Sequence, residues 1–279
     1  MADPDARLIA LEGIHNFRDY GGYPVAGGGR VRRGWLWRSG QHHEATDADL
    51  DQVRALGLKA VFDLRSARER ASHPCRRPAG FSAVLHAIED APPIDGGPGV
   101  GKGATPAAPH VAAAHAAAAR PSRERTPEET REGMRHTYAT MPFRPALAAA
   151  LRQMMTVLAR TDGPSLVNCM AGKDRTGIAV AIVQRALGVH RDDVVGDYLL
   201  TGRLGDQEAR IAAGYRTFVQ ATGELEDAVV RAIMGIEPSY IEAALDAVAA
   251  AGGEERYFRD VLGVDPGARA ALRARLVEG

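Results

Sequence analysis

Residues 168–177 read Asn-Cys-Met-Ala-Gly-Lys-Asp-Arg-Thr-Gly. They follow an apolar segment, 164–167, and precede an apolar-periodic run over 178–183. This order predicts a buried strand that ends at Cys169, a tight loop, and a helix that begins at Arg175. In such a loop, successive main-chain N–H groups point to one centre, and the helix adds the positive end of its dipole. The stretch therefore predicts a site for a doubly charged oxyanion such as phosphate.

Two side chains give this predicted loop its chemistry. Cys169 lies at its floor with the sulfur facing the anion, and Arg175 grips two oxygens with its planar fork. Helix N-termini and nearby cations lower the pKa of a thiol, so we expect a thiolate that attacks phosphorus in line and forms a phosphocysteine. Thr176 can donate to the departing sulfur when water breaks this intermediate. No metal or cofactor is needed, because a cation and amides take its place. The predicted phosphate-binding residues are Met170, Ala171, Gly172, Lys173, Asp174 and Arg175.

The loop resembles the signature of a known enzyme family. The pattern Cys-x5-Arg-Thr is similar to the cysteine-dependent protein tyrosine phosphatases, and the Lys and Asp inside the loop resemble a bacterial tyrosine/serine branch, members of which also act on phosphoinositides. Three further blocks resemble the same branch in the same order: Asn-Phe-Arg-Asp-Tyr-Gly-Gly at 16–22, Gly-Trp-Leu-Trp-Arg-Ser-Gly at 34–40, and Asp-Leu-Arg-Ser at 63–66 followed by Glu69. The resemblance covers most of residues 11–200 and implies a dual-specificity tyrosine phosphatase.

A phosphate ester also needs a general acid to protonate its leaving group. Many tyrosine phosphatases carry an Asp on a mobile loop before the nucleophile, but this chain has no Asp within 96–161. Two carboxylates remain: Asp174 in the loop, and Asp63 at the end of a predicted buried strand. Neighbouring parallel strands would bring both to the carboxyl edge of a sheet. We favour Asp174 over Asp63 as the acid, and the family resemblance likewise implies the in-loop Asp as acid with Asp63 as helper. Alternatively, Asp63 forms an ion pair with Arg65 or Arg18 that holds the sheet edge.

One position departs from the family pattern. The residue before the nucleophile is normally His, which helps to orient the loop and keep the thiolate ionised, and here it is Asn168. Since Asn can also donate to a backbone carbonyl, we expect the loop to form, with a less acidic nucleophile and an activity optimum at higher pH. This departure and the missing mobile-loop Asp leave a second function open, a catalytically weak phosphate-binding protein. The retained Cys169, Arg175 and Thr176 favour the enzyme.

The rest of the pattern predicts an α/β fold with a central, mostly parallel sheet flanked by helices. Short strands are expected within 8–40, and Thr46 with Asp49 predicts a helix start. Further strands are expected over 58–64, 81–88 and 166–169, and helices over 111–119, 127–160 with a break at 141–145, and 175–187. We interpret residues 1–279 as one phosphatase domain, with a mobile loop and helical lid over 91–160 and a helical elaboration over 189–279.

The composition suits a single soluble enzyme. The chain has 279 residues, 45% of them hydrophobic, and 35 basic residues balance 35 acidic ones, so no net charge favours nucleic acid. The nine histidines show no metal-binding spacing, and no metal is expected. Cys75 is interpreted as an incidental thiol, or else as a redox partner of Cys169. Neither a leader nor an apolar stretch of 18 residues is visible. This favours a cytoplasmic protein without an integral membrane segment, and secretion without a leader stays compatible with it.

The substrate is less determined than the reaction. A phosphorylated protein or a phosphoinositide fits the predicted site, because Lys173 adds a second cation that suits an inositol phosphate as well as phosphotyrosine. Four aromatic residues can form the wall of a phosphotyrosine pocket or belong to the core: Phe17, Tyr20, Trp35 and Trp37.

Overall fold

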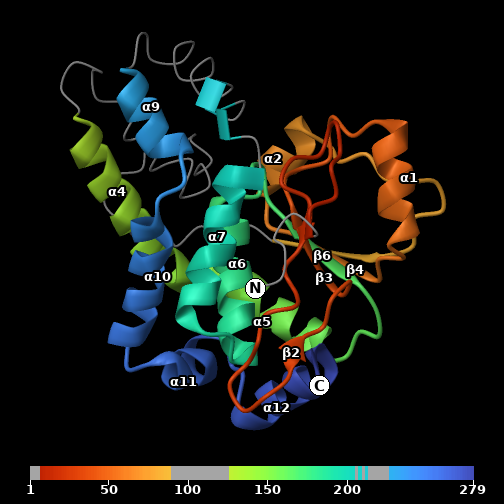
Figure 1. The fold of residues 1–279 in the computed structure, drawn as a ribbon, viewed down its shortest axis with the longest axis vertical. Helices are drawn as coiled ribbons and strands as arrows, with labels where there is room; N and C mark the ends of the chain where they lie inside the picture. The colour runs from red at the N-terminus through yellow and green to blue at the C-terminus, as the bar shows by residue number, and fades with distance from the viewer. Residues whose placement is uncertain (1–6, 89–125, 205–206, 209–210, 213–225) are drawn as a thin grey trace, which may run out of the picture.

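A computed structural model describes residues 7–88, 126–204, 207–208, 211–212 and 226–279. The expected helix over 111–119 lies outside these residues, as does the whole of the loop expected over 91–110. Within the described part, a five-stranded sheet has the order β1-β3-β6-β4-β5 (Figure 1). The strands in this order are Arg18–Asp19, Leu36–Ser39, Ser165–Asn168, Ala60–Asp63 and Val84–Ala87.

The sheet is parallel except at one edge. β3, β6, β4 and β5 run parallel, and β1 pairs antiparallel with β3. The expected mostly parallel sheet is therefore confirmed. β4 and β6 are neighbours, with Asp63 opposite Asn168 at the carboxyl edge. The loop that follows β6 thus starts in the middle of the sheet, beside the end of β4.

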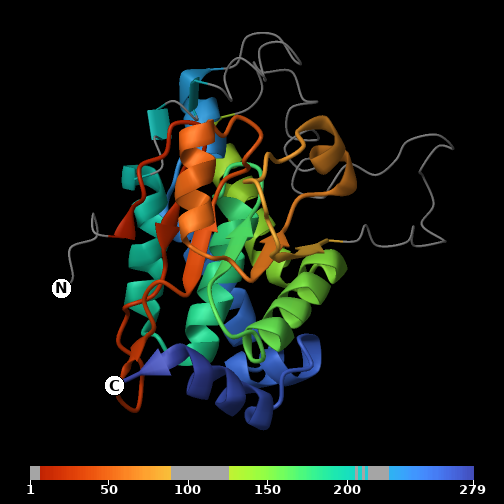
Figure 2. The same cartoon turned by 90° about the vertical axis from the view of Figure 1, so that its right-hand side faces the viewer.

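Helices lie on both sides of the sheet and make up most of the C-terminal part (Figure 2). The chain ends in β7 (Val277–Glu278), which pairs with β2 (Arg30–Val31) and was not expected. The helical segments are α1 Asp47–Ala55, α2 Ala67–Ser72, α4 Pro127–Thr140, η3 Met141–Phe143, α5 Pro145–Leu158, α6 Asp174–Leu187, α7 Arg191–Leu204, α9 Asp227–Met234, α10 Pro238–Ala250, α11 Glu254–Arg256, η4 Tyr257–Val261 and α12 Pro266–Leu276.

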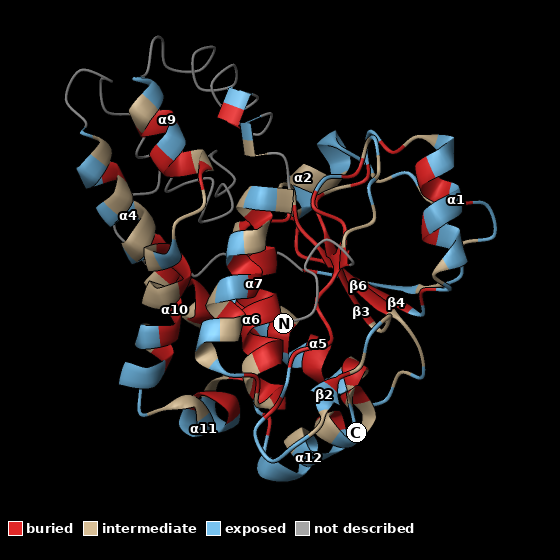
Figure 3. Cartoon of the chain, viewed as in Figure 1, coloured by how far each residue is buried: buried red, intermediate tan, exposed pale blue. Residues whose placement is uncertain are grey.

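Side chains of the central strands alternate between two apolar layers, because successive residues of a strand face opposite sides. Val61 and Leu166 pack toward α1, where Leu50 and Val53 are buried. Phe62 and the other strand residues that face away from α1 pack in a larger core under α5 and α6. Figure 1 shows α1 on one side of the sheet and these two helices on the other, and Figure 3 shows their buried faces turned toward the strands.

The break expected at 141–145 is confirmed, since η3 separates α4 from α5. α4 packs against α9 and α10, whereas α5 packs against β4, β5 and α6. Leu151 and Met154 of α5 are fully buried. Within the segment 91–160, α5 therefore belongs to the core of the fold instead of a lid. A lid role for the remainder stays a prediction.

A buried ion cluster joins the sheet to α7. Asp197 Oδ2 accepts from Arg38 of β3 at 2.8 Å and from Arg18 of β1 at 3.3 Å, and all three side chains are almost fully buried. Tyr23 donates to Asp197 Oδ1 at 3.2 Å, and Thr201 accepts from both arginines. Burial alone would raise the pKa of Asp197, but the two guanidinium groups lower it below its usual value. The carboxylate therefore stays charged between them.

We predict that Asp197→Asn lowers the free energy of unfolding by about 3–5 kcal/mol, because it leaves two buried arginines without their counter-charge. Urea denaturation at pH 7 measures this. Asp192→Asn is the matched control on the same helix; its side chain is 89% exposed, so its effect should stay within about 0.5 kcal/mol. Because the folded-state pKa of Asp197 is lowered, the wild-type advantage should shrink as the pH falls below about 4. An equal effect of the two variants would contradict this role.

Candidate active site

The predicted loop lies at the carboxyl edge of the sheet, between the end of β6 and the start of α6. The helix begins at Asp174, one residue before the expected start. Cys169 directly follows the strand and is 3% exposed. Cys169 is one of the groups that raise the pKa of Arg175. The roles of Cys169 as nucleophile and of Arg175 as anion-binding cation stay predictions.

Carbonyl groups of the loop are bonded on its outer side. The Met170 carbonyl accepts from the Gln41 N–H at 3.0 Å, and the Gly172 carbonyl accepts from Asn16 Nδ2 at 2.9 Å and from Arg38 Nη2 at 3.0 Å. Because a trans peptide is planar, the N–H that follows each carbonyl points the opposite way. The N–H groups of Ala171 and Lys173 therefore point away from these outside donors, as the predicted binding of an oxyanion by the loop requires.

Gly172 is the one loop position where the backbone itself excludes a side chain. Its φ is +65°, a left-handed conformation that costs a residue with a Cβ atom about 1 kcal/mol or more. A Cβ atom there would lie 2.6 Å from the backbone of Ser39 and Gly40. The loop therefore packs directly on the segment that follows β3, which explains why Gly is required.

Arg175 is held by its outer edge. Nη1 and Nη2 each donate to a different Glu69 oxygen at 2.7 Å, and Nη1 also donates to the Leu64 carbonyl at 2.7 Å. Burial alone would lower the pKa of Arg175, but its bonds to Glu69 and the nearby Cys169 raise it. A guanidinium has five N–H groups, and these bonds use three of them. The other two, on Nε and Nη2, share one edge and suit two oxygens of a phosphate.

Glu69 is positioned by the helix start that contains it. Ser66 and Glu69 form a capping box on α2: the Glu69 N–H donates to Ser66 Oγ, and Glu69 Oε2 accepts from the Ser66 N–H at 2.8 Å. The same Oε2 accepts from Arg175. Glu69 belongs to a block that resembles the family, but this role in holding Arg175 was not predicted. The Ser-x-x-Glu spacing was the available signal.

Asp174 lies at the first position of α6, with its side chain 28% exposed. Its Oδ1 accepts from the Tyr138 hydroxyl at 2.5 Å and lies 3.3 Å from Lys173 Nζ. Thr176 is buried, and its hydroxyl has no hydrogen-bond partner among the described residues. The roles predicted for the Asp174 carboxyl and the Thr176 hydroxyl stay predictions.

The Lys173 side chain lies toward α9 and α10. This side chain is 2% exposed, and its ammonium donates to the Ile233 carbonyl at 2.6 Å and lies 5.8 Å from the centre of the Tyr240 ring. The backbone of Lys173 is part of the loop, as expected. Contact of its ammonium with a bound phosphate stays a prediction.

Asp63 is held by an ion pair. Its two oxygens accept from Arg65 Nε and Nη2 at 2.8 and 2.7 Å, and it is buried. Asn168 Nδ2 donates to Asp63 Oδ1 at 3.3 Å, so this amide bonds a side chain and not the backbone carbonyl that we expected. The Asn168 carbonyl oxygen Oδ1 is buried without a partner among the described residues. Of the two readings of Asp63, the pair with Arg65 is the one the structure contains; a helper role stays a prediction.

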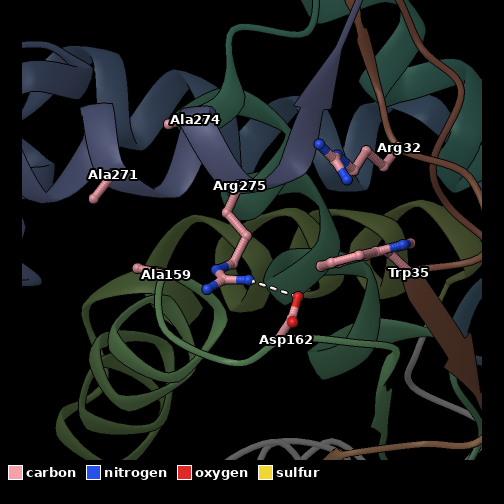
Figure 4. A pocket seen from close by; sticks show the side chains of 7 residues that line it. All are labelled: Arg32, Trp35, Ala159, Asp162, Ala271, Ala274 and Arg275. Carbon is pink, nitrogen blue, oxygen red and sulfur yellow. Dashed lines mark hydrogen bonds and ion pairs between the residues drawn. The ribbon is translucent and has the colours of Figure 1, made fainter.

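Aromatic residues considered for a substrate pocket belong elsewhere. Phe17, Tyr20 and Trp37 are buried in the core. Trp35 lines a cavity of about 540 Å³ beside α12, with Arg32 near its ring and an Arg275–Asp162 ion pair opposite (Figure 4). None of the predicted site residues lines this cavity.

Cys75 and Cys169 are both free thiols, and Cys75 accepts from the His42 N–H at 3.3 Å. A redox partnership between the two thiols stays a prediction. Within the described residues there is no cluster of His, Cys, Asp and Glu placed to hold a metal ion. No helix in that same part of the chain is long and apolar enough to cross a membrane.

Comparison of the chain with known proteins points to one family. The model of the tyrosine phosphatase family matches residues 9–278. The chain belongs to the tyrosine phosphatase family. It is 32% identical over 274 residues to a Cupriavidus necator protein named as a tyrosine-protein phosphatase, a match that covers 97% of this chain and 89% of the relative. It is also 32% identical over 257 residues to the triple specificity protein phosphatase PtpB of Mycobacterium tuberculosis, covering 84% of this chain and 86% of that protein.

Family membership confirms the resemblance that the loop and the three N-terminal blocks indicated. It also explains why those blocks occur together. The block at 16–22 contains Asn16, the block at 34–40 contains Arg38, and the block at 63–66 ends in Ser66. Each of these three residues supports the loop or its arginine through a contact described above. The loop and the three blocks therefore form one structural unit, in which residues of the blocks hold the loop and its arginine in place.

We predict that Glu69→Gln lowers kcat/KM for an aryl phosphate by about 100-fold, because Arg175 loses the charge that fixes its outer edge. Glu254→Gln is the matched control: Glu254 also binds an arginine of α6 through both oxygens, Arg185, at the opposite end of the helix. Steady-state kinetics of both variants measure the effect. Equal losses would mean that the Glu69 pair supports stability and not the site.

Proposed function

We propose that the protein is a phosphomonoester hydrolase that works through a phosphocysteine intermediate on phosphotyrosine, with phosphoserine, phosphothreonine and phosphoinositides as further substrates. One observation carries this proposal. Arg175 is clamped by Glu69 through Nη1 and Nη2, and its bonds to Glu69 and to the Leu64 carbonyl do not use the Nε–Nη2 edge, which we propose faces the phosphoryl group on Cys169. A cation that presents two parallel donors next to a nucleophile suits a transferring phosphoryl group.

In the first step, the Cys169 thiolate attacks phosphorus, the S–P bond forms and the P–O bond to the leaving group breaks. Asp174 gives its proton to the leaving oxygen. Negative charge develops on the equatorial oxygens of the phosphoryl group, where the loop N–H groups and Arg175 stabilise it. A phenol or an alcohol leaves, and the phosphocysteine and the Asp174 carboxylate remain.

In the second step, water attacks the phosphocysteine. The Asp174 carboxylate takes a proton from the water, the O–P bond forms and the S–P bond breaks. Thr176 donates a hydrogen bond to the departing sulfur, a role that suits its buried hydroxyl, which has no partner in the described part of the chain. Inorganic phosphate then leaves, and the thiolate and the protonated acid are restored.

The substrate range is proposed from the relatives and from the charge of the loop. The mycobacterial relative is named a triple specificity protein phosphatase, which supports a site that accepts more than one phosphorylated residue. Lys173 adds a cation whose ammonium lies 3.3 Å from Asp174. If this cation turns toward the substrate, it suits a head group with several phosphates.

A catalytically weak phosphate-binding protein is the second candidate. Asn168 stands where the family has His, and its side-chain oxygen is buried without a partner among the described residues. This observation favours a loop whose thiol is less well supported. The enzyme remains the better proposal, because phosphate binding alone does not need Cys169 and Thr176.

We predict that Cys169→Ser lowers the rate of hydrolysis of p-nitrophenyl phosphate and of a phosphotyrosine peptide by at least about 1000-fold, since it removes the nucleophile. Cys75→Ser is the matched control and should keep wild-type activity. Acid quenching during turnover, followed by mass spectrometry, should find one phosphate on Cys169 in the wild type. If wild type and Cys169→Ser both bind phosphate and are equally inert, the second candidate is correct.

We predict that Asp174→Asn lowers kcat for phenyl phosphate by about 100-fold or more, and kcat for p-nitrophenyl phosphate much less, because only the poorer leaving group depends on protonation. Asp63→Asn is the comparison variant, and it should lower both rates by a similar factor through the loss of its pair with Arg65. The opposite pattern, with the much larger loss for phenyl phosphate found only in Asp63→Asn, would assign the acid to Asp63.

A further inference from the structure

Two buried tyrosines form a chain of hydroxyl groups that ends on Asp174. Tyr138 of α4 and Tyr198 of α7 are each no more than 1% exposed. Their hydroxyl oxygens lie 2.8 Å apart, and the Tyr138 hydroxyl lies 2.5 Å from Asp174 Oδ1. Residues from three helices thus meet at the first turn of α6, beside the phosphate loop.

The number of protons fixes the direction of this chain. Each phenol carries one O–H group. Tyr138 donates its proton to Asp174, so the bond between the two phenols requires Tyr198 as donor and Tyr138 as acceptor. A donor that also accepts is polarised toward the carboxylate, which strengthens its bond. Asp174 Oδ1 therefore receives a hydrogen bond that Tyr198 reinforces.

The surroundings hold both phenols in place and in their neutral form. Burial, and next the charge of Asp174, raises the pKa of Tyr138 and of Tyr198 well above the usual value. The two rings contact edge to face at 6.0 Å, and the Tyr138 ring lies 5.6 Å from Tyr240. Gly177 makes room for the second ring, since a Cβ atom there would lie 3.0 Å from Tyr198 Cδ2.

We propose that Tyr138, backed by Tyr198, is a positioning residue for the general acid of the reaction. Because the Tyr138 hydroxyl donates a hydrogen bond to Asp174 Oδ1, the proton that Asp174 transfers is carried on Oδ2. The two tyrosines thereby select the reactive oxygen of the carboxyl. After transfer, the same bond stabilises the carboxylate that must activate water in the second step. This inference rests on the proposed function, in which Asp174 is the acid and base.

The arrangement affects the pH dependence of the reaction. Among the described residues, the groups that interact with the carboxyl include Tyr138, Tyr198, Lys173 and Arg175, with Tyr240 and Arg38 acting on Tyr198. A donor bond and a nearby cation both favour the charged form of a carboxyl. Removal of the Tyr138 hydroxyl would therefore let Asp174 keep its proton to higher pH while its orientation is lost.

The experiment is the pH profile of kcat/KM for a phosphotyrosine peptide, measured for wild type, Tyr138→Phe and Tyr240→Phe. We expect Tyr138→Phe to lower the plateau between about 10- and 100-fold and to move the alkaline limb, where the acid loses its proton, to higher pH. Tyr198→Phe should move it in the same direction by less. Tyr240→Phe is the matched control: the buried Tyr240 hydroxyl donates to the Ala232 carbonyl and not to the Asp174 carboxyl, so the alkaline limb of this variant should stay in place.

Two results would overturn the inference. If Tyr138→Phe loses activity but its alkaline limb stays in place, as the limb of Tyr240→Phe should, the Tyr138 hydroxyl has only a structural role. If Tyr138→Phe still shifts the limb in an Asp174→Asn background, it acts on another group. Failure of the proposed function is recognised separately, because Asp174→Asn alone would then keep the wild-type alkaline limb. Vanadate inhibition, expected to be unchanged in Tyr138→Phe, shows that the loop has formed.

Discussion

The site depends on holding a loop with its carbonyl groups outward. A peptide turned the other way would present an oxygen to an incoming phosphate and repel it. Gly172 shows how this is prevented: its carbonyl accepts from both Asn16 and Arg38, and its contact with Ser39 and Gly40 leaves no space for a side chain. Arg38 is in turn fixed by the buried carboxylate of Asp197. The binding loop is thus supported from the sheet and from α7, elements far apart in the sequence.

The arginine of the site is supported through an unrelated device. The capping box of α2 fixes Glu69 in the way that many helix starts fix an acid. Because α2 follows β4, and β4 neighbours β6, this helix start lies beside the start of α6. The carboxylate that satisfies the Ser66 N–H therefore also meets Arg175. A local stabilising interaction and the orientation of a reactive group share one side chain, which explains why Ser66 and Glu69 occur together.

The sequence predicted the central part of the fold well because its signals were local. A strand, a short loop and a helix could be placed around Cys169, and the parallel neighbour β4 brought Asp63 to the same edge. Contacts between distant segments were missed, since nothing in the spacing joins Tyr138 to Asp174 or Asn16 to Gly172. These contacts form only in the packed tertiary structure, where the helices and the N-terminal segments lie against the loop. The orientation of the Lys173 side chain toward α9 was missed for the same reason, because it depends on a bond to the carbonyl of the distant Ile233.

In the proposed site, inward main-chain N–H groups and the Nε–Nη2 edge of Arg175 hold a phosphoryl group against Cys169. A crystal structure of the protein with vanadate would show whether they do. We expect vanadium at bonding distance from Sγ, equatorial oxygens bound by loop N–H groups and by Nε and Nη2 of Arg175, and an intact Glu69 pair. Vanadate bound away from the sulfur, or loop carbonyls turned toward the anion, would contradict this proposal.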